Sequence, residues 1–199
     1  MPIRVDFRAG NDTHQFDNQI QAVITDVFNK HPFFSQTVKP PHCLTIRVSI
    51  GDIFNDNRFN TSINYDSFFV DQSADLMIEK LDLHHGSSPF NPPSIVPRCL
   101  EKTIAHELGH FIDACLDQAF QYAHAHRPSG NLRMILNDLW NSYIDARLGS
   151  LAPCTLQERQ QEAACRRVPA PLIERAWNSE FKTYPTLLGA ARDVSTLRT

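Results

Sequence analysis

Residues 100–120, LEKTIAHELGHFIDACLDQAF, contain the pattern that decides the fold of this chain. Apolar side chains recur there every three or four positions, which predicts one long amphipathic helix over residues 98–122. The apolar positions are Leu100, Ile104, Leu108, Phe111, Ile112, Cys115, Leu116 and Phe120. A stripe of this kind is typical of a helix that packs one face against a core.

The chain before this helix shows mainly strand patterns. Residues 3–8 alternate apolar and charged side chains, and residues 43–50 and 76–83 also read as strands. One further strand is predicted at residues 67–70, SFFV. The apolar spacing of residues 15–28 instead predicts an amphipathic helix that ends before a His-Pro pair.

The chain after residue 122 shows helical patterns only. A second helix is predicted from Asn131, a suitable N-cap, to Leu148, with Gly149 as the residue that ends it. Two more helices are predicted at residues 155–167 and 171–193. Strands followed by helices predict an α+β fold with a small mixed β-sheet.

Length and composition fit one globular domain over residues 1–199. Of the 199 residues, 42% are hydrophobic and 21% are charged, which suffices for a core and excludes a disordered chain. Residues 1–97 would form the sheet and one helix, and residues 98–199 would be helical.

The charge balance and the apolar runs exclude several partners. A formal net charge of −3 gives no global positive field for nucleic acid or an anionic membrane surface. No apolar run approaches the roughly 18 residues of a membrane span, and residues 1–12 do not resemble a signal peptide. The five cysteines are odd in number and form no Cys-x-x-Cys pair, which favours reduced thiols. A cytoplasmic protein is therefore expected.

The sequence His106-Glu107-Leu108-Gly109-His110 lies inside the central predicted helix. Positions four apart on an α-helix differ by about 40° of rotation and about 6 Å of rise. Two imidazoles at this spacing can therefore bind one zinc ion. Glu107 is poorly placed as a ligand of the same ion, but well placed to take a proton from a metal-bound water.

This five-residue motif is similar to the signature of the zincin metallopeptidases. The predicted sheet before the motif helix and the second helix after it also resemble the zincin arrangement. The resemblance implies that Glu107 is the general base. It also implies that the last predicted strand, at residues 76–83, is an edge strand that pairs with an extended peptide substrate.

A catalytic zinc ion takes three protein ligands, so one more is needed. The long zincin motif with a third histidine is absent, because Leu116 stands there. The pattern Trp140-Asn141-x-x-x-Asp145 resembles small predicted bacterial metallopeptidases in which this aspartate coordinates the metal, and so implies Asp145 as the third ligand. Asp138, on the same predicted face, is the first alternative, and a loop histidine, His124 or His126, is the second. The other reading is that these carboxylates cap the helix or pair with Arg133 or Arg147.

Several further residues are candidates for the surroundings of a metal site. Asp113 and Asp117 continue the histidine face and could accept a hydrogen bond from a ligand histidine. The remaining candidates are the loop or rim histidines and two tyrosines that could donate to an oxyanion: His84, His85, His124, His126, Tyr143 and Tyr184.

The resulting hypothesis is a zinc-dependent hydrolase, most simply a peptidase, that acts on a peptide or protein substrate. Zn²⁺ would be held by His106, His110 and Asp145, with Glu107 as general base. One alternative is a non-catalytic zinc protein with a binding or regulatory role. Another is a deformylase-like hydrolase in which Cys43 or Cys154 is a ligand.

Overall fold

The structure is a computed structural model that describes residues 3–7, 17–37, 44–51, 62–66, 68–79, 97–120 and 128–196. The chain divides into two compact units, Met1–Ile112 and Asp113–Thr199. The boundary lies near the end of helix α5 (Pro97–Cys115). The single domain expected from the sequence stays a prediction.

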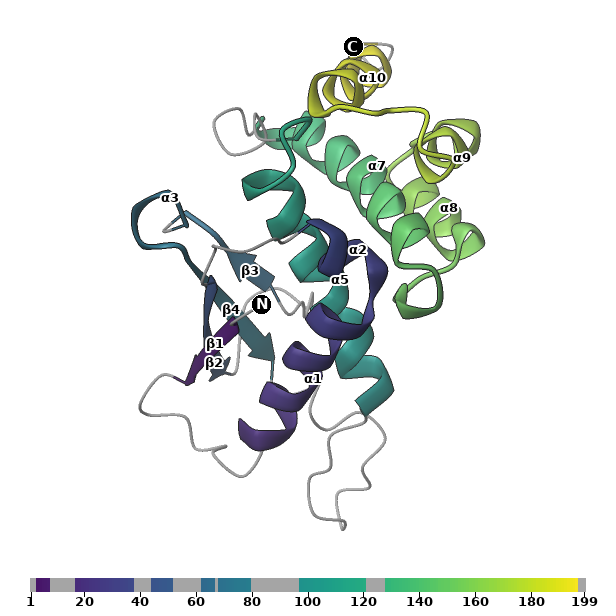
Figure 1. Ribbon diagram of the computed structural model, residues 1–199. Coiled ribbons are helices and arrows are strands. Elements are labelled where there is room, and N and C mark those ends of the chain that lie inside the picture. Colours follow the sequence, from purple (N-terminus) through teal and green to yellow (C-terminus); the bar gives the residue numbers. More distant parts are fainter. Residues whose placement is uncertain are drawn as a thin grey trace. The chain divides into compact units, whose positions relative to one another are not determined.

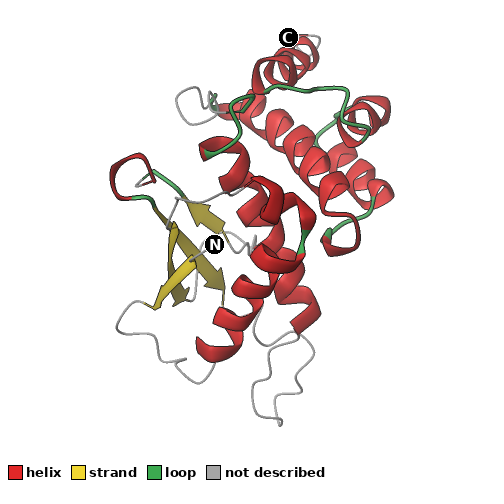
Figure 2. Cartoon of the chain, in the orientation of Figure 1, coloured by secondary structure: helices red, strands yellow, loops and turns green. Residues whose placement is uncertain are grey.

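Unit 1 contains a mixed sheet of four strands, as expected for an α+β chain (Figures 1 and 2). The strands are β1 (Ile3–Phe7), β2 (Leu44–Gly51), β3 (Ser62–Asn64) and β4 (Ser73–Glu79), in the order β1-β2-β4-β3. β1 and β4 both run parallel to β2, whereas β3 runs antiparallel to β4. β3 therefore lies at one edge of the described sheet. The expectation that the strand predicted at residues 76–83 is an edge strand is wrong, because β4 is internal and pairs with both β2 and β3.

The sheet buries one face because its apolar residues alternate. Leu44, Ile46 and Val48 of β2 and Ala74, Leu76 and Ile78 of β4 are all buried. On the other face, Arg47 and Asp75 are opposite each other in the register, and Arg47 Nε donates to Asp75 Oδ1 at 3.0 Å. The period of two thus separates an apolar layer from a charged one.

Helices cover one side of this sheet (Figure 1). α1 (Asp17–Lys30) buries Ile20, Ile24, Val27 and Phe28, and the short α2 (Pro32–Thr37) follows it directly. α5 lies on the same side and buries Leu100, Ile104 and Leu108, members of the predicted apolar stripe. The helix expected at residues 15–28 and the central helix are therefore confirmed.

Unit 2 is helical and is arranged around α7 (Gly130–Leu148), which contacts each of the other three helices. These are α8 (Leu156–Cys165), α9 (Ala170–Trp177) and α10 (Tyr184–Thr196), and the 3₁₀ turn η2 (Gly149–Leu151) ends α7. Gly149 has a φ of 56°, a value that glycine adopts without strain, as expected for the residue that ends the helix.

The strand predicted at residues 67–70 is wrong, since Phe68–Asp71 form the short helix α3. Asn64 Oδ1 accepts from the backbone N–H of Asp66 at 2.9 Å, so a local turn precedes a helical one. The sequence prediction missed β3, and it placed β4 three residues too late. Residues 80–83 of that predicted strand lie outside the described residues.

Two helix boundaries also differ from expectation. α5 ends at Cys115 instead of residue 122, because Asp117 Oδ1 accepts from the N–H of Ala119 at 2.9 Å and forms a turn. The N-cap of α7 is Ser129 and not Asn131, since the helix begins at Gly130.

The helix predicted over residues 171–193 is two helices, α9 and α10. Ser179 has a φ of 57°, which interrupts the α-helical backbone. Thr183 Oγ1 accepts from the N–H of Thr186 at 3.4 Å, a side-chain cap for the start of α10. The predicted helix at 155–167 is confirmed as α8.

Candidate functional site

The three residues of the motif lie on α5 in unit 1. His106 is buried at 6% exposure, while Glu107 and His110 are half-buried. The rings of the two histidines have centroids 5.0 Å apart and planes at 83°. The i, i+4 spacing therefore brings the two imidazoles together on one side of the helix, as the sequence predicts.

This ring separation fits two imidazoles that share a zinc ion. With Zn–N bonds of about 2.0–2.1 Å and a ring nitrogen about 1.1 Å from the centroid, the ion would lie about 3.2 Å from each centroid. At a tetrahedral angle, the centroids would then be about 5.2 Å apart. The observed centroid distance of 5.0 Å is close to that value, so the ring separation is compatible with two imidazoles on one zinc ion.

Aromatic packing holds the turn that contains His110. Phe111, the next residue, is fully buried, and its ring is 5.3 Å from that of Phe68 and 6.4 Å from that of Tyr65. Phe68 belongs to α3, and Tyr65 follows the edge strand β3. The segment next to β3 thus packs directly on the motif helix within unit 1.

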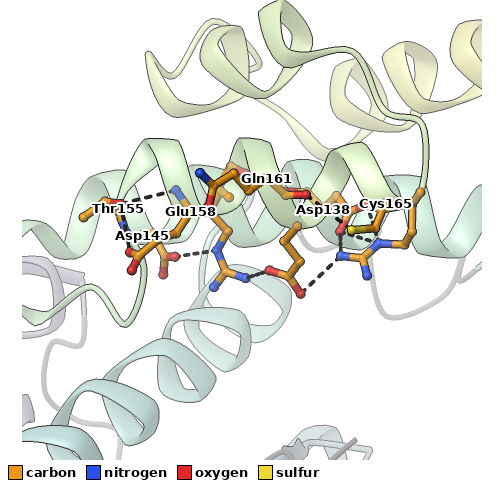
Figure 3. Close-up of polar contacts among 10 residues, drawn as sticks. Asp138, Asp145, Thr155, Glu158, Gln161 and Cys165 are labelled. Carbon is orange, nitrogen blue, oxygen red and sulfur yellow. Dashed lines mark hydrogen bonds and ion pairs between the residues drawn. The ribbon is translucent and has the colours of Figure 1, made fainter.

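Asp145, the predicted third ligand, lies on α7 in unit 2. Its carboxylate is fully buried, and its Oδ2 accepts a hydrogen bond of 2.7 Å from Arg159 Nε of α8 (Figure 3). Asp138, the alternative, is 5% exposed and accepts from both Nε and Nη2 of Arg166. The two candidate carboxylates are therefore bound by Arg159 of α8 and by Arg166, the C-cap residue of the same helix.

A third acidic residue joins the two pairs. Glu162 Oε2 accepts from Arg159 Nη1 at 2.8 Å, and its Oε1 lies 3.2 Å from Arg166 Nη2. The five charges form a continuous row along α7 and α8: Asp145, Arg159, Glu162, Arg166 and Asp138. We call this set the arginine row.

The electrostatics of the row favour the charged form of both arginines. Burial acts to lower the pKa of Arg159, but attraction and hydrogen bonding to Asp145 outweigh it and raise the pKa above its ordinary value. The hydrogen bonds that Arg166 donates to Asp138 chiefly raise the pKa of Arg166. Both guanidinium groups thus stay positive against buried carboxylates.

Asp113 has a different environment from the one expected. It is fully buried, and its Oδ2 accepts from Trp140 Nε1 at 2.8 Å and from Arg147 Nη2 at 2.5 Å. Its Oδ1 is buried without a hydrogen-bond partner. Burial raises the pKa of Asp113 above the usual aspartate value. Trp140 of the Trp-Asn pattern therefore binds a buried aspartate in unit 2.

The other candidates are placed as follows. Asp117 caps the turn after α5, Tyr143 lies under the guanidinium of Arg147 at 4.0 Å, and Tyr184 is 1% exposed beside Trp140. Cys154 and Cys165 are free thiols, and burial raises the pKa of Cys154. Several candidates lie outside the described residues: His84, His85, His124, His126 and Cys43.

Within the described part of the chain, no group of three or more His, Cys, Asp or Glu side chains is arranged to hold a metal ion.

The sequence reasoning missed Arg159 and Arg166. A weak signal for the two arginines was present, because they are seven residues apart on a predicted helix. Asp138 and Asp145 have the same spacing on theirs.

Comparison with known proteins gives no relative. No protein-family model matches the chain, and neither a curated protein nor a solved structure matches it. No helix in the described ranges combines the length and the apolar character needed to cross a membrane.

Proposed function

We propose that this protein is a zinc-dependent hydrolase of zincin type, and that its substrate is a peptide or protein. The observation that carries the proposal is the pair of imidazoles on α5, whose centroids are 5.0 Å apart. The pair follows from the motif His106-Glu107-Leu108-Gly109-His110, which sequence and helix geometry both favour as a zinc half-site. Asp145 is proposed as the third ligand.

Glu107 is the proposed general base. It lies next to His106 on α5 and is half-buried, so its carboxylate is not fully removed from water. Zinc, when bound, would supply a water of lowered pKa and a positive charge that polarises a scissile carbonyl. Glu107 would accept a proton from that water and pass it to the leaving amine.

The edge of the sheet is the proposed binding surface for an extended peptide. The zincin resemblance implies an edge strand upstream of the motif, and β3 occupies that position, at the end of the order β1-β2-β4-β3. An edge strand offers backbone N–H and C=O groups to a peptide that adds to the sheet. This assignment replaces the last predicted strand by β3 as the substrate strand.

A cytoplasmic location is part of the proposal. The free thiols of Cys115, Cys154 and Cys165 support a reducing compartment.

The test uses the full chain loaded with zinc and fluorescein-labelled casein as substrate. The change Glu107→Gln should leave the zinc content at the wild-type value and abolish hydrolysis, because it removes only the base. Glu101→Gln on the same helix is the matched control and should keep full activity. Full activity of Glu107→Gln would refute the mechanism. A wild-type chain that binds zinc but hydrolyses nothing would favour the non-catalytic alternative.

A further inference from the structure

The outer edge of β3 has an apolar face and a charged face. Within the described sheet, β3 pairs with β4 and stands at the end of the strand order (Figure 1). In the register, Ile63 is opposite Leu76, and Asn64 is opposite Asp75. Residues that are directly opposite have their side chains on the same face of a sheet. Ile63 therefore belongs to the apolar face, and Asn64 belongs to the charged face.

The apolar face at this edge continues onto the motif helix of unit 1. Leu76 is fully buried and Ile63 is half-buried. Tyr65, two residues after Ile63, is buried, and its ring centroid lies 6.4 Å from that of Phe111 on α5. Side chains alternate along an added strand, so the residue opposite Ile63 would have its side chain on this face. An apolar side chain suits that position, because its surface would be removed from water there.

The charged face at the same edge is acidic. Residues 62–79, which run from β3 through α3 to β4, contain four acidic residues and no lysine, arginine or histidine. Arg47 of β2 donates to Asp75 at 3.0 Å and to Asp71 at 3.4 Å, so one cation faces two of these carboxylates. Hydrogen bonds from Ser73 lower the pKa of Asp71, and the Asp71 side chain is 48% exposed. Negative charge thus exceeds positive charge in this part of unit 1.

We propose that the outer edge of β3 selects an extended peptide in which an apolar residue is flanked by lysine or arginine. The apolar side chain lies beside Ile63, and the cationic side chains of its two neighbours lie on the acidic face. Backbone hydrogen bonds to β3 hold the peptide, and the complementary charge sets which peptides bind. The inference rests on the proposed function in taking this peptide as the substrate, but the binding itself needs no metal.

The test measures binding of the fluorescein-labelled peptide Lys-Val-Lys-Val-Lys to the full chain by fluorescence anisotropy, without added metal. The peptide Glu-Val-Glu-Val-Glu has the same apolar pattern and the opposite charge, and it should bind at least about 10-fold more weakly. Asp66→Lys reverses the charge of an exposed residue two positions after β3, and it should weaken binding of the lysine peptide about fivefold.

Two further variants control for folding and for net charge. Asp66→Asn removes the charge without adding one and should weaken binding in the same direction, so it decides the matter if Asp66→Lys fails to fold. Asp193→Lys makes the same charge reversal at an exposed position of α10 in unit 2, and it should leave the Kd unchanged. An equal loss in Asp66→Lys and Asp193→Lys would overturn selection at the edge, because the effect would then belong to the net charge of the chain.

N-methylated peptides test the strand geometry. In an extended strand, the N–H groups of successive residues point to opposite sides, so either the lysines or the valines direct their N–H groups to β3. N-methylation of that set should abolish binding, whereas N-methylation of the other set should preserve it. If both N-methylated peptides bind as well as the parent peptide, the peptide does not add to β3 as a strand.

The failure of this inference and the failure of the proposed function give different results. Equal or absent binding of the lysine and glutamate peptides, with casein still hydrolysed by the zinc-loaded chain, would overturn the selection and leave the hydrolase intact. Binding with the expected selectivity by a zinc-loaded chain that hydrolyses nothing would refute the hydrolase. The edge of β3 would then remain a binding surface for cationic peptides.

Discussion

Asp113→Ala should destabilise unit 2 strongly, because Asp113 is a fully buried acceptor for two donors. The change removes the acceptor of the Trp140 indole N–H. A buried donor without an acceptor costs about 1–3 kcal/mol. It also breaks the pair with Arg147. Breaking a buried pair costs roughly 3–5 kcal/mol, and the 19% exposure of the Arg147 side chain lowers that value to about 2 kcal/mol.

The burial of the Asp113 carboxylate partly offsets this loss of stability. Burial raises the pKa of Asp113, so keeping the charged form in the folded protein has a free-energy cost that the alanine variant does not have. We therefore expect a net loss of about 2–4 kcal/mol in the free energy of unfolding. For a unit of this size, 1 kcal/mol corresponds to about 4–8 °C in Tm, so Tm should fall by about 10 °C or more.

Tryptophan fluorescence is the suitable probe for this measurement. The chain has two tryptophans, Trp140 and Trp177, and both lie in unit 2. Asp193→Ala, at an exposed position of α10, is the matched control and should change stability by no more than about 0.5 kcal/mol. If Asp113→Ala lowers Tm no further than this control, the two hydrogen bonds do not carry the stability that we assign to them.

Three further changes test other parts of the structure. Because the folded-state pKa of Asp113 is raised, its stabilising contribution is complete below about pH 4 and is lost as pH rises through the raised pKa. The unfolding free energy of wild type should thus fall more than that of Asp113→Asn between pH 4 and pH 7 in urea titrations, and parallel curves would contradict this. Thr155→Ala removes the capping box of α8 and should cost about 1 kcal/mol, seen as a lower Tm by tryptophan fluorescence; an unchanged Tm would show that the cap is not needed. Leu76→Ala in the buried face of β4 should cost about 2–5 kcal/mol in unit 1, measured by far-UV circular dichroism, with exposed Met77→Ala as its control.

Long periodic segments of this fold could be predicted from the sequence. The apolar stripe of α5 and the strand pattern of β2 extend over many residues, so the repeat itself defines the element. β3 has only three residues, which is too short for a period, and its place at the edge of the sheet comes from pairing with β4. The break between α9 and α10 depends on the backbone of Ser179, whose side chain gives little sign of it.

The sequence predicted only those parts of the candidate site whose residues are close together along the chain. His106 and His110 are one helical turn apart, so helix geometry alone brings their rings together. The partners of the aspartates are distant in sequence: Asp138 pairs with Arg166 and not with Arg133, which is closer along the chain. Arg147, the other expected partner, instead donates to Asp113, 34 residues away. Such contacts depend on tertiary packing, which no local pattern encodes.

The equal spacing within the arginine row defines how α8 is aligned along α7. Asp138 and Asp145 are seven residues apart, as are Arg159 and Arg166, and the pairs form in opposite chain directions. Seven residues are close to two helical turns, about 10.5 Å, so both pairs form together in one alignment of the two helices. One residue inserted between Arg159 and Arg166 would rotate the second arginine by about 100° relative to the first. A change of length in the turn between α7 and α8 therefore leaves both ion pairs possible. An insertion or deletion between Arg159 and Arg166 does not.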